Sequence, residues 1–247
     1  MPLVSIIIVN YKTPELTKKC IESVYKFEPK NAFEIVLIDN GSNDGSVDLF
    51  KSSFPDIQLI ENTDNLGFAK ANNQGIKASK GEYIFLLNSD TELVEPILEK
   101  LIKNLELNEY TGAVVPRLLN SDHTLQPSVF RLPTVTGAIK EYWFNQSNYF
   151  GKYAPNQNES TVLVESAVMA AMLIPRQIFD QIGLLDEKFF MYFEDLEFCR
   201  RLRKNGLKII YSNKSQLLHH HGASNKKDDN AWKRLIPSSK QYHGTLK

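Results

Sequence analysis

Four strand-like runs alternate with helix-like segments over residues 4–87 and constrain the fold more than any other feature of the chain. The runs are Val4–Val9, Phe33–Ile38, Gln58–Glu61 and Glu82–Leu87. Most of them are apolar without polar alternation, which is typical of strands buried on both faces. Repeated strand–helix units favour a parallel sheet covered by helices on both faces. We therefore predict the α/β class, with a mostly parallel, Rossmann-like central sheet flanked by helices.

Polar side chains follow each run at the point where the predicted strand ends. These clusters are Asn10-Tyr11, Asp39-Asn40, Asn62 to Asn65, and Asn88 to Asp90. Ligands of open α/β sheets bind beyond the carboxyl ends of the strands. The sequence therefore predicts a ligand site along this edge of the sheet.

The second half of the chain has weaker periodicity. Helices are expected over Glu95–Asn108, Arg176–Ile182 and Glu194–Asn205, and strands over Gly112–Pro116, Val162–Ile174 and Leu207–Tyr211. The stretch from about Asn120 to Ser160 is rich in Asn, Gln, Ser and aromatic residues. The charged and polar tail from Ser224 is expected to be loosely ordered.

Charge and hydropathy exclude several classes of protein. Lys and Arg number 29, as do Asp and Glu, so the formal net charge is zero and no nucleic-acid partner is expected. Apolar runs such as Leu3–Val9 are far shorter than the ~20 residues that span a bilayer, and the first residues show no cationic signal-peptide region. The two cysteines, Cys20 and Cys199, make no disulfide framework. A cytoplasmic protein is expected.

Three groups of residues could carry chemistry, and each also has an ordinary structural interpretation. Asp90 could ligate a divalent cation, or Asn88-Ser-Asp90 could be a turn. The three histidines at 219–221 could bind a metal, or they could form a polar surface loop. Glu194 and Asp195 follow the mostly aromatic residues 189–193, so one could be a general base, or both could only cap a helix.

Common nucleotide-binding and hydrolase signatures are absent from the sequence. No G-x-G-x-x-G follows the first strand, and there is neither a Walker A lysine loop nor a G-x-S-x-G elbow. The turn Asn10–Pro14 has no glycine amides that could wrap a pyrophosphate. A bound diphosphate would therefore need a metal ion to neutralise it.

Six motifs occur together in an order that resembles one enzyme family. They are Val4–Tyr11, Val36–Ser46, Glu61–Ala69, Leu86–Thr91, Phe189–Leu202 and His219–Ser224. With these motifs the chain resembles the family 2 glycosyltransferases, and among them the rhamnosyltransferase-like subgroup with the GT-A fold. The resemblance implies one GT-A domain with a nucleotide-sugar-binding half at residues 1–115. Residues 116–247 would form the acceptor-binding and catalytic half, with a polar tail after about 224.

The resemblance also implies roles for individual residues. Asp39 matches the acid that hydrogen-bonds a uracil or thymine base. Asp90 matches the metal-binding acid of the family's D-x-D motif, and His219 matches a further metal or diphosphate ligand. Asp195 matches the catalytic base, with Glu194 as the next candidate. The other expected contacts of the nucleotide sugar are Asn10, Tyr11, Asn40, Asn65, Gly67, Phe68, Lys70, Asn72 and Asn88.

The implied reaction is a single in-line displacement with inversion, assisted by Mg²⁺ or Mn²⁺. The donor would be a dTDP- or UDP-linked hexose or deoxyhexose, with rhamnose as the first choice. The acceptor would be a saccharide or a lipid-linked saccharide in polysaccharide biosynthesis. Such an acceptor would bring a cytoplasmic enzyme to the inner face of the membrane, as a peripheral partner of it.

Two alternatives stay open at this point. Glu165 stands where an aspartate is common in the subgroup, and Met169 stands where a glycine is common. These differences allow a degenerate protein that binds nucleotide sugar without turnover. A sugar-phosphate nucleotidyltransferase would need a glycine-rich first turn, which the chain lacks. The aromatic residues of the 120–160 stretch could stack on a sugar, form a second small core or make a homodimer contact: Tyr142, Trp143, Phe144, Tyr149, Phe150 and Tyr153.

Overall fold

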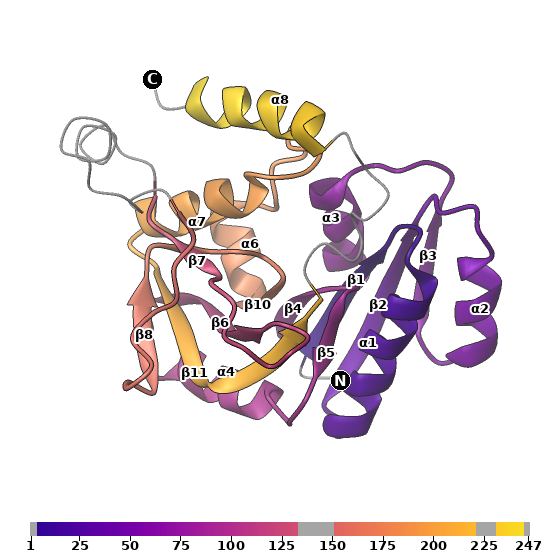
Figure 1. Ribbon diagram of the computed structural model, residues 1–247, viewed down its shortest axis with the longest axis horizontal. Coiled ribbons are helices and arrows are strands. Elements are labelled where there is room, and N and C mark those ends of the chain that lie inside the picture. The colour runs from indigo at the N-terminus through magenta and orange to yellow at the C-terminus, as the bar shows by residue number, and fades with distance from the viewer. Residues whose placement is uncertain (1–3, 133–150, 221–230, 245–247) are drawn as a thin grey trace.

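The computed structural model describes residues 4–132, 151–220 and 231–244, in which helices flank a central sheet (Figure 1). The first half contains the predicted strand–helix units. They are β1 (Val4–Asn10), α1 (Pro14–Phe27), β2 (Phe33–Asn40), α2 (Ser46–Ser53), β3 (Gln58–Asn62), α3 (Phe68–Ala78) and β4 (Tyr83–Asn88). The predicted α/β class with a central, mostly parallel sheet flanked by helices is confirmed.

The parallel part of the sheet brings its carboxyl ends together as predicted. Within the described residues nine strands form the main sheet, in the order β3-β2-β1-β4-β10-β6-β11-β5, with β8 paired to β11. From β3 to β4 all strands are parallel, and Asn10 lies beside Asp39 in the register. Asn40 pairs with Asn62, and Val9 with Asn88. The polar clusters therefore share one edge of the sheet.

The second half extends the same sheet with strands of mixed direction. Its elements are β5 (Thr91–Leu93), α4 (Leu98–Glu106), β6 (Thr111–Leu119), β7 (Val129–Phe130), β8 (Thr161–Val164), β9 (Ser166–Ala167), β10 (Ala171–Pro175), α6 (Arg176–Ile182), α7 (Glu194–Lys204), β11 (Lys208–His219) and α8 (Ala231–Gly244). Strand β10 runs antiparallel between β4 and β6. Strand β7 pairs with β9 in a separate two-stranded sheet.

Two predicted strands differ from the observed ones, for physical reasons. The run Val162–Ile174 forms three short strands, β8, β9 and β10, which pair with β11, β7 and β4 respectively. Strand β11 continues eight residues beyond the predicted end at Tyr211, through an irregularity between Ser212 and Gln216. Ser212 and Ser215 are fully buried there and bond to each other, so hydropathy concealed this continuation.

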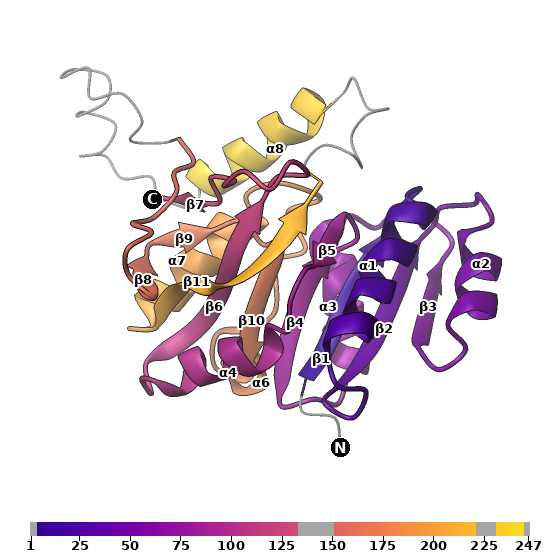
Figure 2. The ribbon, with the colours of Figure 1, turned by 60° about the horizontal axis from the view of Figure 1, so that its bottom comes forward.

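The tail expected to be loosely ordered contains a helix where it is described. Helix α8 (Ala231–Gly244) lies above α7 in both views (Figures 1 and 2). Its inner side chains Ser238 and Tyr242 are buried, whereas Leu235 and Ile236 are exposed. A few apolar contacts therefore order a segment whose composition alone indicated a polar tail. No helix within the described residues is long and apolar enough to cross a membrane.

Side chains on the two faces of the sheet form two separate cores. On β1, Ile7 belongs to the core under α3, α6 and α7, whereas Ile6 and Ile8 belong to the core under α1, α2 and α4. Burial on both faces accounts for the lack of polar alternation in the runs. Polar residues are consequently confined to the strand ends, where they can form a site.

Candidate active site

Asp39, at the carboxyl end of β2, is held in a compact polar network. One carboxylate oxygen accepts from Asn10 Nδ2 at 2.7 Å, and the other accepts from the Ser42 backbone N–H at 3.0 Å. Asn10 Nδ2 also donates to Ser42 Oγ, and Asn10 Oδ1 accepts from Thr17 Oγ1 at 2.7 Å. Asn10 and Asp39 are 0% and 2% exposed. The two residues predicted to hold the nucleotide base are therefore pre-organised against each other.

Asn40 organises the turn between β3 and α3. Its Nδ2 donates to Asn65 Oδ1, and its Oδ1 accepts from Asn62 Nδ2 and from the Leu66 backbone N–H. Asn65 Oδ1 also accepts from the Gly67 backbone N–H at 2.9 Å. Asn40 and Asn65 thus shape this turn with their side chains, which is a structural role that the sequence did not reveal.

Gly67 and Phe68 join this turn to the aromatic segment 189–193. Gly67 has φ +84°, and a Cβ there would meet the Phe190 carbonyl oxygen at 2.5 Å. The Phe68 backbone N–H donates to that same oxygen at 2.7 Å. Only glycine combines this left-handed conformation with so close a backbone approach. The Asn-x-Gly-Phe motif therefore connects segment 189–193 to the edge of the sheet where β1, β2 and β4 end, which we call the donor edge because the nucleotide-sugar donor is expected there.

The remaining residues predicted to contact the nucleotide sugar lie around this edge and differ in burial and in hydrogen bonding. Tyr11 is half-buried with the Lys12 ammonium 5.3 Å from its ring centre, and Lys70 is exposed at the start of α3. Asn72 is buried and donates from Nδ2 to the Phe68 carbonyl, so its amide supports α3. Asn88 is half-buried, and its backbone oxygen accepts from Thr91 Oγ1.

Asp90 and His219, 129 residues apart in sequence, face each other across the β5–β11 pairing. His219 pairs with Thr91 in the register, and His219 Nε2 lies 3.5 Å from Asp90 Oδ1. Both side chains are buried, at 5% exposure for Asp90 and 7% for His219. The structure therefore brings together the two residues predicted to bind a metal.

Gln126, which the sequence analysis did not single out, orients the His219 ring. Gln126 Nε2 donates to Asn120 Oδ1 at 2.8 Å and to the His219 backbone oxygen at 3.2 Å. Gln126 Oε1 is consequently turned to His219 Nδ1, at 2.7 Å, and this nitrogen donates. A neutral His219 then carries the lone pair of its Nε2 toward Asp90. The sequence gave no indication of this role of Gln126, because an isolated glutamine in a polar stretch carries no recognisable pattern.

This donor set suits a divalent cation that takes its other ligands from substrate and water. An imidazole nitrogen and a carboxylate oxygen are ligands for Mn²⁺ and Mg²⁺, and a hydrogen bond to the other ring nitrogen is the usual support of a metal-binding histidine. In the described residues no group of three or more His, Cys, Asp or Glu side chains converges on one point. Two protein ligands leave positions for diphosphate oxygens.

His220 has a different role from His219. Its Nε2 lies 2.9 Å from Glu92 Oε1, and its Nδ1 lies 2.7 Å from Ser121 Oγ. Its backbone N–H donates to the Asp90 carbonyl oxygen. With both ring nitrogens engaged, His220 fastens the end of β11 to β5 and to the turn after β6. His221, Gly222 and Ser224, the rest of that predicted motif, lie outside the described residues.

Glu194 and Asp195 begin α7 in contrasting environments. Glu194 is 7% exposed, and its Oε2 has no hydrogen-bond partner among the described residues, whereas Asp195 is half-buried and accepts from the Leu196 backbone N–H at 2.8 Å. Burial raises the pKa of both carboxyls, and the charge of Asp195 raises the pKa of Glu194 further. Lys152 opposes the rise in the pKa of Asp195. Asp195 is therefore the more accessible base, and Glu194 the group more readily kept neutral.

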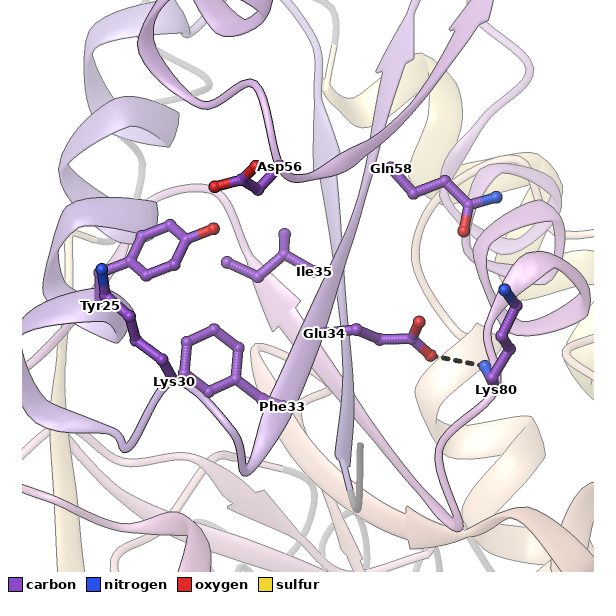
Figure 3. A pocket seen from close by; sticks show the side chains of 8 residues that line it. All are labelled: Tyr25, Lys30, Phe33, Glu34, Ile35, Asp56, Gln58 and Lys80. Atoms are coloured by element: carbon purple, nitrogen blue, oxygen red, sulfur yellow. Dashed lines mark hydrogen bonds between the residues drawn. The ribbon is translucent and has the colours of Figure 1, made fainter. Parts of the chain in front are cut away.

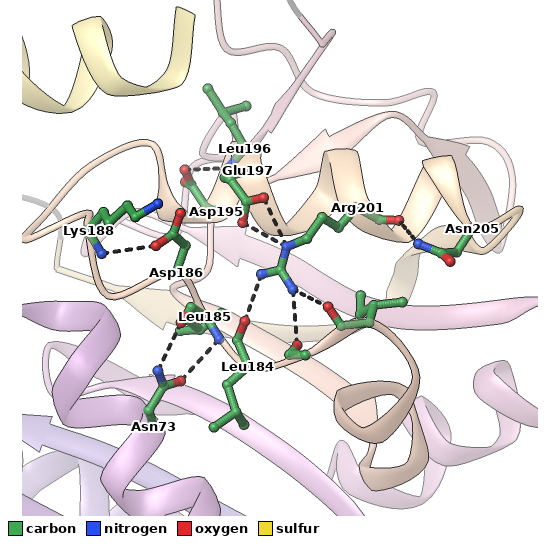
Figure 4. A network of polar contacts seen from close by, with 12 residues as sticks. Asn73, Leu184, Leu185, Asp186, Lys188, Asp195, Leu196, Glu197, Arg201 and Asn205 are labelled. Carbon is green, nitrogen blue, oxygen red and sulfur yellow. Dashed lines mark hydrogen bonds and ion pairs between the residues drawn. The ribbon is translucent and has the colours of Figure 1, made fainter. Parts of the chain in front are cut away.

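A polar network holds the loop that leads into this pair (Figure 4). Arg201 pairs with Glu197 at 2.9 Å and donates to the carbonyl oxygens of residues 182, 183 and 184. Asn73 of α3 exchanges two hydrogen bonds with the Leu185 backbone and donates to Glu187. Neither Arg201 nor Asn73 was predicted, because both act on backbone atoms that only the fold brings near.

A cavity of about 420 Å³ lies at the other edge of the sheet and is separate from the site (Figure 3). It is lined by Phe33, Glu34 and Ile35 where β2 begins, and by Tyr25, Lys30, Asp56, Gln58 and Lys80. Glu34 accepts there from the Lys80 backbone N–H. Asp39 and Asn40, which end β2, lie at the opposite edge.

The two substitutions that left a degenerate protein open have structural roles. Met169 is 3% exposed and packs in the core under α3, α6 and α7. Glu165 accepts from the Leu132 backbone N–H at 2.9 Å and pairs with Arg203 at 3.3 Å. Of the predicted sugar-stacking aromatics, Tyr153 is half-buried and bridges to Val129, whereas residues 142–150 lie outside the described residues.

Comparisons with known proteins identify the family of this chain. The model of the family described as glycosyl transferase family 2 matches residues 5–183. The chain is 31% identical over 210 residues to the low-salt glycan biosynthesis hexosyltransferase Agl10 of Haloferax volcanii, covering 83% of this chain and 63% of that relative. It is 26% identical over 212 residues to an N-acetylglucosaminyl-diphospho-decaprenol L-rhamnosyltransferase of Mycobacterium tuberculosis, covering 78% and 68% respectively.

A solved structure of the same fold supports the architecture. The structure of GalNAc-T7 with UDP, GalNAc and Mn²⁺ superposes with a TM-score of 0.68 at 17% identity, covering 90% of this chain and 44% of that one. The expected GT-A glycosyltransferase fold is confirmed. The chain belongs to glycosyl transferase family 2. It spans less than two thirds of the length of Agl10.

Proposed function

We propose that this protein is an inverting, metal-dependent glycosyltransferase. It would move a hexose or deoxyhexose, with rhamnose as the first choice, from a dTDP- or UDP-sugar to a saccharide or lipid-linked acceptor in polysaccharide biosynthesis. Residues 1–115 would supply most of the donor site, and residues 116–247 the base and the acceptor surface. Such an acceptor favours a cytoplasmic location at the inner membrane face.

One observation carries this proposal: the approach of His219 Nε2 to within 3.5 Å of Asp90 Oδ1. Gln126 holds the ring with that nitrogen directed at the carboxylate. These two residues would hold Mn²⁺ or Mg²⁺ at the edge where β4 ends. When bound there, the cation supplies charge stabilisation to a diphosphate leaving group.

Asp195 would act as the general base. It is half-buried at the start of α7, so a carboxylate oxygen can be reached by an acceptor hydroxyl. As the oxygen of the acceptor hydroxyl attacks the anomeric carbon, the hydroxyl proton passes to Asp195. The bond between the anomeric carbon and the diphosphate oxygen breaks on the opposite face. One such displacement inverts the anomeric configuration. Glu194, buried beside Asp195 and with a raised pKa, would stay protonated and avoid a second negative charge.

Calorimetric titration with UDP and dTDP, with and without Mn²⁺, tests the donor site. Tight binding that requires Mn²⁺ in the wild type, and weak binding in Asp90→Asn, is the expected result. His220→Gln is the matched control, because that ring fastens strands and faces Glu92 and Ser121. Nucleotide binding that is independent of Mn²⁺ in every variant would remove the basis of the metal assignment.

A panel of nucleotide sugars with saccharide and lipid-linked acceptors then tests turnover. Transfer with inverted anomeric configuration, read by proton NMR of the product, is the expected result. Tight nucleotide binding without transfer or hydrolysis of any donor would favour the degenerate alternative. Release of pyrophosphate from a sugar phosphate and a nucleoside triphosphate would instead identify a nucleotidyltransferase.

A further inference from the structure

Helix α8 contacts the chain on both sides of the carboxylate pair. Ser238 Oγ donates to the Met191 backbone oxygen at 2.8 Å. The Tyr242 ring packs on Phe193, with ring centres 5.4 Å apart, and lies 4.7 Å from the Arg200 guanidinium. Tyr242 is 0% exposed, although it lies only two residues before α8 ends at Gly244. Met191 and Phe193 precede Glu194, and Arg200 follows Asp195.

The turn that α8 contacts has an unusual backbone. Tyr192 has φ +70° and Phe193 has φ +69°, so two successive residues with side chains adopt the left-handed conformation. Phe193 is the N-cap residue of α7, and no side chain of the described residues makes the N-cap hydrogen bond of this helix. Such a conformation is costly and persists only where surrounding contacts determine it. Helix α3 contacts this segment at Phe190, through the Phe68 backbone N–H. Helix α8 contacts it at Met191 and Phe193.

We infer that α8 is a clamp on Met191–Phe193, the turn before the carboxylate pair, which we call the catalytic turn. Ser238 and Tyr242 of α8 are positioning residues that hold this turn and thereby aim Asp195. The inference rests on the proposed role of Asp195 as the base. The described contacts of α8 with Met191, Phe193 and Arg200 lie on the side of the carboxylate pair, whereas the hydrogen bonds that build the donor edge come from β1, β2 and the turn before α3. Loss of the clamp is therefore expected to impair turnover and to spare nucleotide binding.

Helix α8 also adds to the burial and the charged surroundings of Glu194 and Asp195, which set the pKa values of the two carboxyls. Around the pair lie Lys152, Glu197 and Arg200, with Tyr242 and His243 contributed by α8. Burial raises the pKa of Tyr242 to about 12, and Glu197 and Asp195 add to this rise against Arg200. Burial is also the main cause of the raised pKa of Asp195. Removing the Tyr242 ring admits water, which lowers the pKa of Asp195 and extends activity to lower pH.

Three variants test the clamp. Tyr242→Ala removes the ring, Tyr242→Phe retains the ring and removes the hydroxyl, and Lys240→Ala changes an exposed position of the same helix. We expect Tyr242→Ala to lower kcat at least tenfold with the Kd for the nucleotide within twofold of wild type. Its acidic limb in the kcat–pH profile should move to lower pH. Tyr242→Phe should restore most of kcat and the wild-type profile, and Lys240→Ala should match wild type.

Hydrogen exchange of the amides of residues 191–197 gives a readout that needs no turnover. Tyr242→Ala should speed exchange there and leave the amides of β1 and β2 unchanged. If the wild type transfers no sugar, the proposed function fails, and this exchange pattern still judges the clamp. A Tyr242→Ala protein with wild-type kcat, pH profile and exchange overturns the inference. Global unfolding of that variant would show as lost nucleotide binding, and Ser238→Ala then replaces it in the same measurements.

Discussion

The donor edge of the sheet and the catalytic turn before α7 are built in opposite ways. At the donor edge the polar side chains satisfy one another, as Asn10 and Asp39 do, in short loops that follow parallel strands. At the catalytic turn Glu194 Oε2 lacks a partner among the described residues, and the backbone is left-handed at two successive positions. The first region follows from the local strand–turn sequence, whereas the second depends on contacts from distant elements.

This difference indicates that the donor edge is suited to ligand binding and the turn before α7 to proton transfer. A saturated network is rigid and holds a ligand in one place, but its groups are already committed to each other. Carboxylates that are buried and under-satisfied have raised pKa values, which suits proton transfer near neutral pH. The turn before α7 therefore carries the proposed base and is supported by contacts from Asn73, Arg201 and α8.

The largest expected effect is that of Asp195→Asn. A positioned general base typically contributes ~10²–10⁴-fold, so kcat should fall by about that factor while nucleotide binding and melting temperature stay close to wild type. Steady-state transfer assays with the identified donor give the measurement. Asp186→Asn, on the loop before α7, is the matched control. Near-native activity in Asp195→Asn would transfer the role to Glu194.

Gln126→Leu is expected to act at the donor edge by freeing the His219 ring. Loss of the hydrogen bond that supports a metal ligand typically costs about 10–100-fold in metal affinity. Titration of Mn²⁺ in the presence of UDP, followed by electron paramagnetic resonance of the free ion, measures this change. Gln216→Leu, on the same β11 strand as His219, serves for comparison. Equal affinity in Gln126→Leu and wild type would contradict the assigned ring orientation.

Gly67→Ala is expected to weaken the connection between the two regions. Gly67 combines φ +84° with ψ 172°, a region that essentially only glycine occupies, so a side chain there costs about 1–3 kcal/mol. The new Cβ must also displace the Phe190 carbonyl. We expect a loss of about 2–3 kcal/mol in the free energy of unfolding, measured by urea denaturation. Gly45→Ala also places a side chain at positive φ, with ψ 0° where Gly67 has 172°, and its Cβ meets nothing within 4 Å, so it gives the cost of a positive φ without a contact. Equal losses in both variants would show that the Phe190 contact adds nothing.

The smallest expected effect is a pH-dependent gain in stability for Glu194→Gln. Burial raises the pKa of Glu194, so the folded state binds a proton that the unfolded state releases above its ordinary pKa of about 4.3. Wild-type stability therefore falls as pH rises from that value through the raised one. The glutamine variant lacks this loss and should gain about 1–2 kcal/mol relative to wild type between pH 5 and pH 8.

Melting curves of both proteins at pH 5, 6, 7 and 8 test this difference. Asp180→Asn, which changes an exposed carboxyl on α6, corrects for the general effect of removing one charge. A difference between Glu194→Gln and wild type that stays constant over this range would mean that Glu194 ionises normally in the folded protein.

The sequence by itself determined the first half of the fold and the chemistry of the edge. Runs such as Val4–Val9 can be satisfied only by burial on both faces, and turn residues after each run bring Asp39 and Asp90 to the strand ends. The positions of the helices α6 and α7 also follow from local periodicity. These features could be predicted because the interactions that produce them lie close together along the chain.

Only the tertiary structure decided how the site is completed. The approach of His219 to Asp90 depends on the continuation of β11 past two buried serines, and the orientation of its ring depends on Gln126. The left-handed turn at Tyr192 and its contact with α8 likewise join segments far apart in sequence. Such contacts are made by single side chains on backbone atoms, which leave no periodic trace in the sequence. They exist only once the whole sheet has assembled, and that assembly places the proposed base and the metal ligands in one domain.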